Sequence, residues 1–417
     1  MSADKHVIIL GGGIGGLEAA ITLCRQNTAS VTLVDPNPVH IWKPSLHEFA
    51  SGTIEHGGNL FSFIELSKRF GFDFIQSSPE KVERDKKIVH LNNGQHLPYD
   101  RLVVAIGARA NDFGTPGAQE HCLFLNNLND ANALHEHFRN ALITAQKTGE
   151  PLTLSIVGGG ATGVQLAAEL CRAIDSTPEL GENARRRLLK PTLIEAMPRL
   201  LPAFPESVSE EAKKELEKIG FDVITEGMVS SIDAQTVTLK DGRSIPASMR
   251  IWAAGVKAGQ ATDLFDGLER SRSGQLIVTP TLQSVDDENI IALGDCSRIN
   301  TNAVAPTAQA ARQEGQYIGR IALPRLLKGQ TPPPFAYHDR GAVVALANYN
   351  AWGMWPSKKA FGGHGIGACF ARFVHEGLFR QHQLCLSGMF KTAFVTLREH
   401  LSPNRPDLAD KSSKKNS

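Results

Sequence analysis

A glycine-rich sequence that occurs twice constrains the fold of this chain more than any other feature. The first copy reads GGGIGG at 11–16 and the second reads GGGATG at 158–163. Each copy follows an apolar, β-branched run and precedes a helix-like segment, which predicts a strand, a tight turn and the start of a helix. Such glycines let the backbone approach a pyrophosphate, and the helix N-terminus offers free N–H groups to the phosphates. One chain with two such units is expected to hold two dinucleotides, which is the layout of a flavoprotein that takes electrons from a nicotinamide.

An acidic residue ends the second predicted strand of each unit. The run 31–34 ends in Asp35, about 20 residues past the first glycine cluster, where such an acid binds ribose hydroxyls. The run 192–194 ends in Glu195, after a longer crossover. Either acid alone could be a polar strand end. The order of strand, glycines, helix and acid, found twice, favours two dinucleotide sites.

Further candidate contacts follow from the strands that close each unit. The strands at 99–105 and 249–255 run into small residues, where the backbone can pass close to a flat ring. A later strand at 289–293 ends in a Gly-Asp pair that can aim a carboxylate at the flavin's ribityl hydroxyls, although Gly-Asp is also common in turns. The residues expected to contact FAD are Gly11, Gly13, Gly16, Asp35, Ala105, Gly107, Gly294 and Asp295. The residues expected to contact NADH are Gly158, Gly160, Gly163, Glu195, Ala254 and Gly255.

The order of these segments predicts an α/β chain with two Rossmann-like dinucleotide-binding domains, the fold of FAD- and NAD(P)-linked reductases. The FAD domain is expected at 1–114 and 276–334, and the NADH domain at 115–275. The similar strand endings support an internal duplication, and the sequence TPPP at 331–334 predicts a linker. A smaller region at 335–417 follows, with amphipathic helices and a polar tail from Asp407 that is expected to be disordered.

Composition excludes several other classes of protein. The chain has 417 residues and a formal net charge of +1, so no global field favours nucleic acid. Its six cysteines show no CxxC or metal-ligand spacing, which predicts a reducing compartment and no metal site. The first strand begins too near the N-terminus for a signal peptide, and no run reaches the roughly 18 apolar residues of a spanning helix. Any membrane contact is therefore expected to be peripheral.

The cysteine pattern also narrows the chemistry on the acceptor side. Disulfide reductases relay electrons through a close cysteine pair beside the flavin, and sulfide-oxidising relatives also need paired cysteines there. Cys296 follows the Gly-Asp pair but has no evident partner, and Cys24 and Cys171 are expected to be packing residues. A cysteine relay is not expected.

Two glutamines on one predicted helix are candidates for the acceptor site. The segment 306–315 is helix-like, and Gln309 and Gln313 share one of its faces at i, i+4 spacing. Neutral amides can hydrogen-bond a quinone carbonyl without placing a charge in an apolar pocket. Spacing alone favours two solvent-facing glutamines over a quinone site.

The C-terminal region carries an apolar stripe at helical spacing, which falls on Leu386, Met389, Phe390, Ala393, Phe394 and Leu397. Lys391, Arg398 and Arg380 lie off this stripe. One interpretation is core packing or a homodimer contact. The other is a helix in the membrane interface, with its basic residues toward anionic headgroups.

The chain resembles the type II NADH dehydrogenases, the single-subunit NADH:quinone oxidoreductases of bacterial respiration, and most of all their enterobacterial-type branch. The resemblance runs from about residue 5 to about residue 405 and is carried by the glycine units and by HIWKPSLHEFA at 40–50, WAAG at 252–255, AQAARQ at 308–313, and ARFV and FKT at 371–374 and 390–392. It implies FAD contacts from Lys43 and Ala308, and catalytic roles for Glu169, Gln309 and Gln313 near nicotinamide and quinone. The chain departs from the family pattern at Ser45, Gln165 and Arg312, where leucine, glutamate and histidine are usual.

The resemblance implies that hydride passes from NADH to FAD and two electrons then pass to a membrane quinone, without proton pumping. NADH, the quinone and the lipid bilayer surface are the expected partners, a homodimer is possible, and nucleic acid is excluded. The expected location is the cytoplasmic side of the cell inner membrane, as a peripheral protein. A sulfide:quinone oxidoreductase and a flavin-bound NADH-sensing protein are the alternatives.

Overall fold

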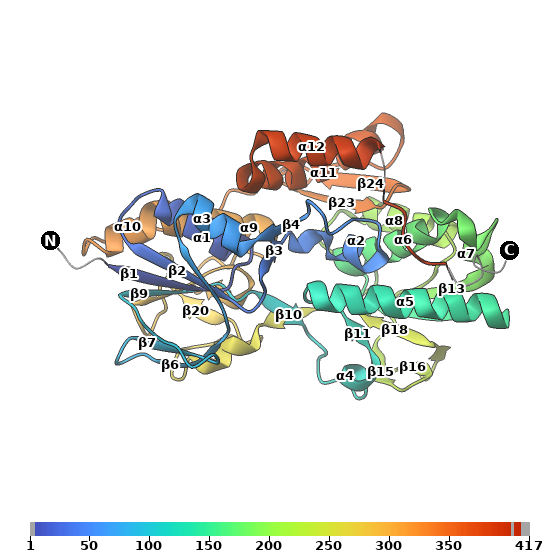
Figure 1. Ribbon diagram of the computed structural model, residues 1–417. Helices are drawn as coiled ribbons and strands as arrows, with labels where there is room; N and C mark the ends of the chain where they lie inside the picture. The colour runs from blue at the N-terminus through green and yellow to red at the C-terminus, as the bar shows by residue number, and fades with distance from the viewer. Residues whose placement is uncertain (1–4, 402–403, 410–417) are drawn as a thin grey trace. The chain divides into compact units, whose positions relative to one another are not determined.

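The computed structural model describes residues 5–401 and 404–409 (Figure 1). The chain forms two compact units, and each is built from separate segments. The first unit contains the chain up to Pro44, Leu60–Arg109 and Val256–His338. The second contains Ser45–Asn59, Ala110–Gly255 and the chain from Asp339 on.

The first unit is built on a five-stranded sheet in the order β21-β9-β1-β2-β5, and every neighbouring pair is parallel. Its strands are β1 (His6–Leu10), β2 (Ser30–Asp35), β5 (Asp73–Gln76), β9 (Arg101–Val104) and β21 (Ile290–Ala292). The central strands are almost wholly buried, as expected of continuous apolar runs in a parallel sheet. Helix α1 (Ile14–Cys24) follows β1 and packs against α9 (Ala308–Tyr317).

Smaller elements complete the first unit. Among the described residues, an antiparallel three-stranded sheet, three two-stranded pairs and short helices surround the main sheet. They are β3 (Val39–Ile41), η1 (Lys43–Ser45), β4 (Leu60–Ser62), α3 (Phe63–Phe70), β6 (Pro79–Glu83), β7 (Ile88–Leu91), β8 (His96–Pro98), β10 (Ala108–Ala110), β19 (Val256–Ala258), η3 (Gln260–Leu264), β20 (Leu276–Val278), η4 (Gly294–Cys296), β22 (Ser297–Ile299), η5 (Ile318–Ala322) and α10 (Leu323–Leu326).

The second unit repeats the main sheet, in the order β11-β18-β12-β13-β14, again with parallel neighbours. Its strands are β11 (Leu123–Phe124), β12 (Leu152–Val157), β13 (Leu189–Ile194), β14 (Asp222–Ile224) and β18 (Met249–Trp252). In both sheets the strand before the glycines is central, and the strand that ends in the acid lies beside it. The predicted internal duplication is therefore present in the topology.

Further elements of the second unit include a hairpin between β16 and β17, whose turn contains Asp241 and Gly242. The remaining elements are α2 (Leu46–Ser51), α4 (Ala118–His121), α5 (Leu128–Thr148), α6 (Ala161–Asp175), η2 (Pro178–Leu180), α7 (Ala184–Leu188), α8 (Glu206–Lys218), β15 (Val229–Ile232), β16 (Thr236–Leu239), β17 (Ser244–Pro246), β23 (Ala342–Leu346), β24 (Asn350–Met354) and β25 (Ala360–Gly362). Helix α2 packs against α5 and α6, so the segment 45–59 belongs to this unit.

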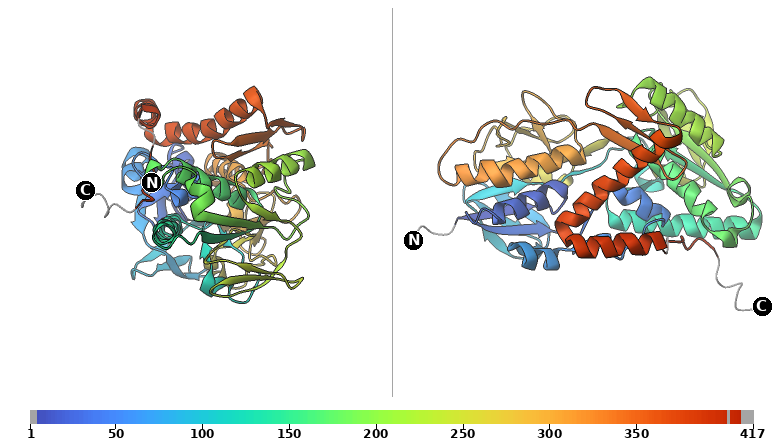
Figure 2. Two further views of the ribbon diagram at one scale, coloured as in Figure 1. Left: turned by 90° about the vertical axis from the view of Figure 1, so that its right-hand side faces the viewer. Right: turned by 90° about the horizontal axis from the view of Figure 1, so that it is seen from above.

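Two helices, α11 and α12, lie near the C-terminus, and here the prediction of one unbroken stripe is wrong. Helix α11 (Gly365–Ser387) stops at Gly388, which has φ 82 and ψ 170, and α12 (Met389–Leu401) starts in a new direction (Figure 2). A positive φ is easy for glycine and interrupts a right-handed helix. Leu386 consequently lies buried on α11, whereas the other stripe residues lie on α12.

The tail from Asp407 was expected to be disordered, and at 407–409 this is wrong. Leu408 is fully buried, and the carbonyl of Pro406 accepts a hydrogen bond from Thr177 at 3.3 Å. Apolar burial therefore anchors this part of the tail. Residues 410–417 lie outside the described residues.

No helix among the described residues is long and apolar enough to cross a membrane. The boundaries predicted for the FAD and NADH domains state which residues bind each cofactor, and they remain a prediction. By packing, the region after Asp339 forms one unit with residues 110–255, and 256–275 pack with the first unit.

Candidate functional site

The first glycine turn brings β1, α1 and β9 into close contact. Gly11 has φ +103, and a Cβ on it would lie 2.4 Å from the carbonyl oxygen of Ala105. Gly13 caps α1 without any side-chain hydrogen bond, and the first turn of the helix has no acidic residue. Since a Cβ on Gly13 would have no neighbour within 4 Å, the positive end of the helix faces open space.

Asp35 holds the first glycine turn from β2. Its carboxylate accepts hydrogen bonds from the backbone N–H of Gly12 at 2.7 Å and of Asn37 at 2.8 Å. Burial raises its pKa, and these hydrogen bonds oppose the shift. Sequence reasoning missed His40, whose buried ring lies 2.7 Å from the carbonyl of Gly12 and donates to it through Nδ1. Burial lowers the pKa of His40 to about 4, so the ring is neutral at pH 7.

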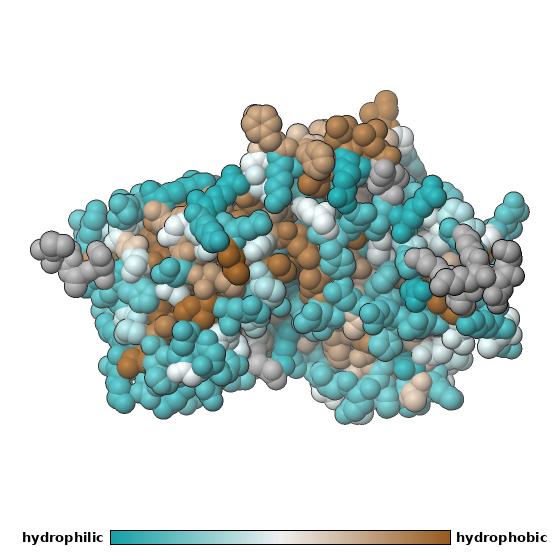
Figure 3. Space-filling view, in the orientation of Figure 1, coloured by the Kyte–Doolittle hydropathy of each residue, from teal (hydrophilic) through white to brown (hydrophobic). Residues whose placement is uncertain are grey.

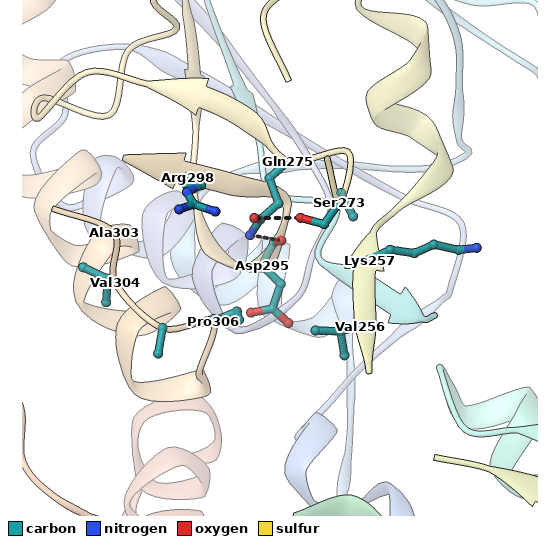
Figure 4. Close-up of a pocket in the computed structure, with 11 residues that line it drawn as sticks. Val256, Lys257, Ser273, Gln275, Asp295, Arg298, Ala303, Val304 and Pro306 are labelled. Carbon is teal, nitrogen blue, oxygen red and sulfur yellow. Dashed lines mark hydrogen bonds between the residues drawn. The ribbon is translucent and has the colours of Figure 1, made fainter. Parts of the chain in front are cut away.

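A pocket of about 390 Å³ lies beside Asp295 in the first unit (Figure 4). The Asp295 carboxylate points into it, while its backbone carbonyl accepts from Gln275 Nε2 at 3.2 Å. Burial raises the pKa of this carboxyl, and the positive charge of Lys43 opposes the shift. Lys43 itself donates to the carbonyl of Ala108 at 2.8 Å. Lys43 therefore lies near both Ala108 and Asp295, and the sequence did not reveal that these three residues are neighbours.

A second acid, Glu314, holds the turn that carries Asp295. Its carboxylate accepts from the backbone N–H of Gly294 at 2.6 Å, and the residue is 5% exposed. Burial raises the pKa of Glu314 to about 7. Because Glu314 follows the predicted pair Gln309 and Gln313 on α9, its i, i+5 position gave no periodic signal.

Gln309 and Gln313 share a face of α9 as predicted, but they are not simply free amides. Gln313 donates to Gln309 at 3.4 Å and to the backbone carbonyl of His338 at 2.9 Å. The N–H of His338 donates back to Gln313 at 3.0 Å. The Gln313 amide is thus held in one orientation by the segment after the predicted linker. Ala308 is the first residue of α9.

The second glycine turn repeats the first in detail. Gly158 has φ +117, and a Cβ on it would lie 2.7 Å from the backbone nitrogen of Ala254. Gly160 caps α6 without a side-chain hydrogen bond, and a Cβ on it would have no neighbour within 4 Å. Gly163 lies against the carbonyl of Gly158, as Gly16 lies against that of Gly11. Gly255 follows directly, with φ +62.

Glu195 holds this turn as Asp35 holds the first. One carboxylate oxygen accepts from the N–H of Gly159 at 2.6 Å and the other from the N–H of Met197 at 2.7 Å. The nearby Arg199 donates to the carbonyls of Phe204 and Pro202, so it is engaged elsewhere. Asp35 and Glu195 therefore each contact the glycine turn of their own unit.

Glu169 is buried in the second unit, with only 3% of its surface exposed. Burial raises the pKa of its carboxyl, and Arg172 is the strongest opposing influence. Arg172 donates to it at 3.1 Å, and Thr53 donates at 2.7 Å. One turn earlier on α6, Gln165 lies 3.4 Å from His375 Nε2 on α11. The unusual glutamine thus pairs with a histidine.

All six cysteines lie among the described residues, and none of them forms a disulfide. Cys296 is fully buried, and its thiol donates to the carbonyl of Leu293 at 3.2 Å. Burial raises the pKa of Cys296 to about 12, which disfavours the reactive thiolate. Within residues 5–401 and 404–409, no cluster of histidine, cysteine or carboxylate side chains could hold a metal ion.

Helices α11 and α12 expose an apolar surface, visible as brown atoms above these helices in Figure 3. Phe390 is 88% exposed and Ile366 is 90% exposed. The other large exposed apolar residues of these helices are Phe370, Phe373, Leu378, Leu384, Met389, Phe394, Leu397 and Leu401. Exposed apolar surface of this extent is typical of an interaction site.

Known proteins identify the family. A model of the pyridine nucleotide-disulphide oxidoreductases matches residues 5–315. A type II NADH:quinone oxidoreductase of Haemophilus influenzae is 36% identical over 438 residues, which cover 95% of this chain and 98% of that protein. The chain belongs to the type II NADH:quinone oxidoreductase family. Its Staphylococcus aureus (strain NCTC 8325 / PS 47) member is 30% identical over 373 residues, which cover 84% of this chain and 89% of that protein.

Solved structures confirm the fold of this family member. NDH2 from Plasmodium falciparum in complex with NADH matches with a TM-score of 0.84 and 20% identity, over 97% of this chain and 99% of that chain. The sulfide:quinone oxidoreductase from Aquifex aeolicus matches with a TM-score of 0.74 and 16% identity, over 96% of each chain. At these identities the likeness shows the fold alone. The predicted α/β fold of FAD- and NAD(P)-linked reductases is thus confirmed.

The residues of this family member fit the two dinucleotides. Each glycine turn presents an uncapped helix N-terminus to open space, as a pyrophosphate requires. The Asp295 carboxylate points into the pocket of the first unit, and burial raises its pKa. A carboxylate in this state suits ligand hydroxyl donors.

Proposed function

We propose that this chain is an FAD-dependent NADH:quinone oxidoreductase that does not pump protons. The observation that carries the proposal is that one chain contains two glycine turns, each of which donates a backbone hydrogen bond to a carboxylate, of Asp35 or of Glu195. The unpaired, buried Cys296 supports direct transfer to a quinone over a cysteine relay.

The first unit binds FAD. The N-terminus of α1, with Gly11, Gly13 and Gly16, binds the pyrophosphate, and Asp35 accepts from the ribose hydroxyls. Asp295 accepts from the ribityl hydroxyls, and Gly294 lets its turn form. The remaining contacts come from Lys43, Ala105, Gly107 and Ala308.

The second unit binds NADH. The N-terminus of α6, with Gly158, Gly160 and Gly163, binds its pyrophosphate, and Glu195 accepts from the ribose hydroxyls. Ala254 and Gly255, which follow the end of β18, contact the nicotinamide. This assignment of FAD to the first unit and NADH to the second follows the prediction of one FAD domain and one NADH domain.

Bound FAD supplies the redox chemistry, since it accepts a hydride from NADH and returns two electrons to a quinone. The overall reaction consumes one proton, because NADH, a proton and quinone give NAD⁺ and quinol. Gln309 and Gln313 hydrogen-bond the quinone head, and the His338 backbone orients Gln313 for this task. The family resemblance assigns a catalytic role to Glu169, and the raised pKa of its buried carboxyl supports a role in proton exchange.

The protein acts as a peripheral protein on the cytoplasmic face of the inner membrane. The support is the exposed apolar surface of α11 and α12, which suits insertion into the bilayer interface. A long-tailed quinone stays in the bilayer, so its oxidoreductase must work at that surface. The same surface could instead join two copies, and a homodimer is the competing arrangement.

A steady-state assay tests the proposal. Purified protein with bound FAD should oxidise NADH with a short-chain quinone, and the quinol should form in equal amount. A stable reduced flavin that a quinone does not reoxidise would instead favour an NADH-sensing role. Sulfide-dependent quinone reduction would favour the sulfide:quinone alternative.

A further inference from the structure

The loop at 52–59, which joins α2 to β4, places a hydroxyl on the buried acid Glu169. Thr53 Oγ1 donates to Glu169 Oε2 at 2.7 Å, and Thr53 is 7% exposed. The same hydroxyl lies 2.9 Å from Ser51 Oγ. A threonine hydroxyl has one proton, so it donates to one acceptor at a time. The position of the loop therefore decides whether that acceptor is Glu169.

Charged groups surround Glu169 on several sides. On α6 itself Arg172 favours its ionised form, and from α2 the carboxylate of Glu48 opposes ionisation while His47 favours it. From α11, His375 contacts α6 at Gln165. The strand β23, which also packs on α6, is the apolar sequence AVVAL. Thr53 is the uncharged donor in this set.

A buried polar network fixes the far end of the loop to the C-terminal helices. Asn59 is fully buried, and its Nδ2 donates to Glu399 Oε1 of α12 at 2.9 Å. Gln383 of α11 donates from Nε2 to Asn59 Oδ1 at 2.9 Å and to the carbonyl of Gly58 at 3.2 Å. Arg380 donates to Gln383 Oε1 at 2.7 Å and pairs with Glu399.

Packing and charge support this attachment. A Cβ on Gly58, which has φ +91, would lie 2.8 Å from Val395 of α12. Arg398 of α12 pairs with Glu55, and Asn404 donates to the carbonyl of Gly52 at 2.7 Å. One face of α12 therefore holds the loop, while its other face carries the exposed apolar residues.

We propose that Thr53 is a positioning residue for Glu169, and that the polar faces of α11 and α12 clamp loop 52–59 to keep its hydroxyl on the carboxylate. The proposal rests on the proposed function, in which Glu169 exchanges the reaction's proton. Loop 52–59 then connects α11 and α12, which face the bilayer in the proposed function, to Glu169. A substitution that opens the clamp should therefore change the pKa of Glu169, although the substituted residue does not contact Glu169.

The test measures the pH dependence of the quinone half-reaction in the full chain with FAD bound, by stopped flow. Thr53→Val keeps the shape but removes the donor, so ionised Glu169 loses a hydrogen bond. The midpoint of the pH profile should move up by about one pH unit, the scale of a hydrogen bond to a charged group. Thr53→Ser should restore the original profile. Reduction of the flavin by NADH should change little.

A second variant and a matched control separate positioning from general damage. Asn59→Ala leaves Thr53 and Glu169 intact but opens the clamp, and it should shift the profile in the same direction by a smaller amount. Thr177→Val removes another buried threonine hydroxyl in the same unit, one that donates to the carbonyl of Ala173 at 2.8 Å. It should leave the profile unchanged.

The failures of the two proposals are distinguishable with Glu169→Gln. If this change leaves the quinone half-reaction and its pH profile intact, the proposed role of Glu169 is wrong. If it abolishes the pH-dependent step while Thr53→Val and Asn59→Ala do not move the profile, the positioning role is wrong. An equal shift in Thr177→Val would also overturn it.

Discussion

The arrangement of Glu195 predicts a strong preference for NADH over NADPH. Both of its carboxylate oxygens are held by backbone N–H groups, of Gly159 and Met197, so the charge cannot rotate away from a bound ribose. Arg199 is the basic residue nearest in sequence, and its guanidinium is committed to the carbonyls of Phe204 and Pro202. A 2′-phosphate would therefore face a fixed negative charge.

The size of the effect follows from Coulomb's law. Two unit charges about 4 Å apart at an effective dielectric constant of about 20 repel by ~4 kcal/mol. This corresponds to roughly 1,000-fold in kcat/KM, and screening at this partly exposed residue reduces the preference to about 30-fold or more. Glu195→Gln removes the charge, so the preference should fall at least about tenfold, chiefly through better use of NADPH.

The assay compares kcat/KM for the two nucleotides at low and high salt. The preference of the parent protein should narrow as salt rises, because the repulsion is partly screened. Asp35→Asn is the matched control, since it alters the corresponding acid of the first glycine turn. It should weaken FAD retention and leave the nucleotide ratio of the flavin-loaded fraction unchanged. Equal use of NADH and NADPH by the parent protein would refute the reasoning.

Four further outcomes are expected. Gln313→Ala should slow quinone reduction in stopped flow and leave flavin reduction by NADH nearly intact; the opposite pattern would move the quinone site elsewhere. Cys296→Ser should retain most activity, because a serine hydroxyl can also donate to the Leu293 carbonyl, and a loss of flavin reoxidation with the fold intact would revive a cysteine relay. Glu314 has a folded-state pKa of about 7, above its ordinary value of 4.5, so its stabilisation is present below 4.5 and is lost as pH rises through 7. The melting temperature of Glu314→Gln relative to the parent should therefore rise between these pH values, and a flat difference would contradict this. Changing Phe390 and Phe394 to serine should weaken co-sedimentation with liposomes by about 100-fold or more, at ~1.5–3 kcal/mol for each inserted side chain, whereas the exposed but remote Phe113→Ser should not.

The dinucleotide units could be predicted because their physics is local. A tight turn needs glycine where φ is positive or where backbones touch, and Gly11 and Gly158 meet both conditions. The strands on either side are apolar runs that only a buried parallel sheet accommodates. Asp35 and Glu195 end these strands, so their contacts with the turns follow from connectivity. For this part of the chain, sequence order and spatial order coincide.

The contacts that the sequence did not show depend on segments far apart in the chain. His40 and Glu314 support turns to which they are not adjacent, and neither lies in a periodic pattern. The segment 45–59 carries the second half of the family motif at 40–50, and its helix α2 packs with α5 and α6. Periodicity also cannot show that Gly388 breaks a helix, because one positive φ leaves the apolar spacing intact.

The basic residues of the C-terminal helices show how contacts that the sequence did not reveal change the expected membrane contact. From the sequence, Arg380 and Arg398 were interpreted as partners for anionic headgroups. In the structure Arg380 pairs with Glu399 and Arg398 with Glu55, so each charge is already balanced within the protein. Attachment should then depend on apolar insertion of α12 more than on lipid charge.

Truncating the chain before Leu384 would also remove the buried Leu386 and Leu408, so it cannot separate attachment from folding. Because α12 holds loop 52–59 with the face opposite its apolar residues, a change in attachment acts on the same helix that keeps Thr53 beside Glu169.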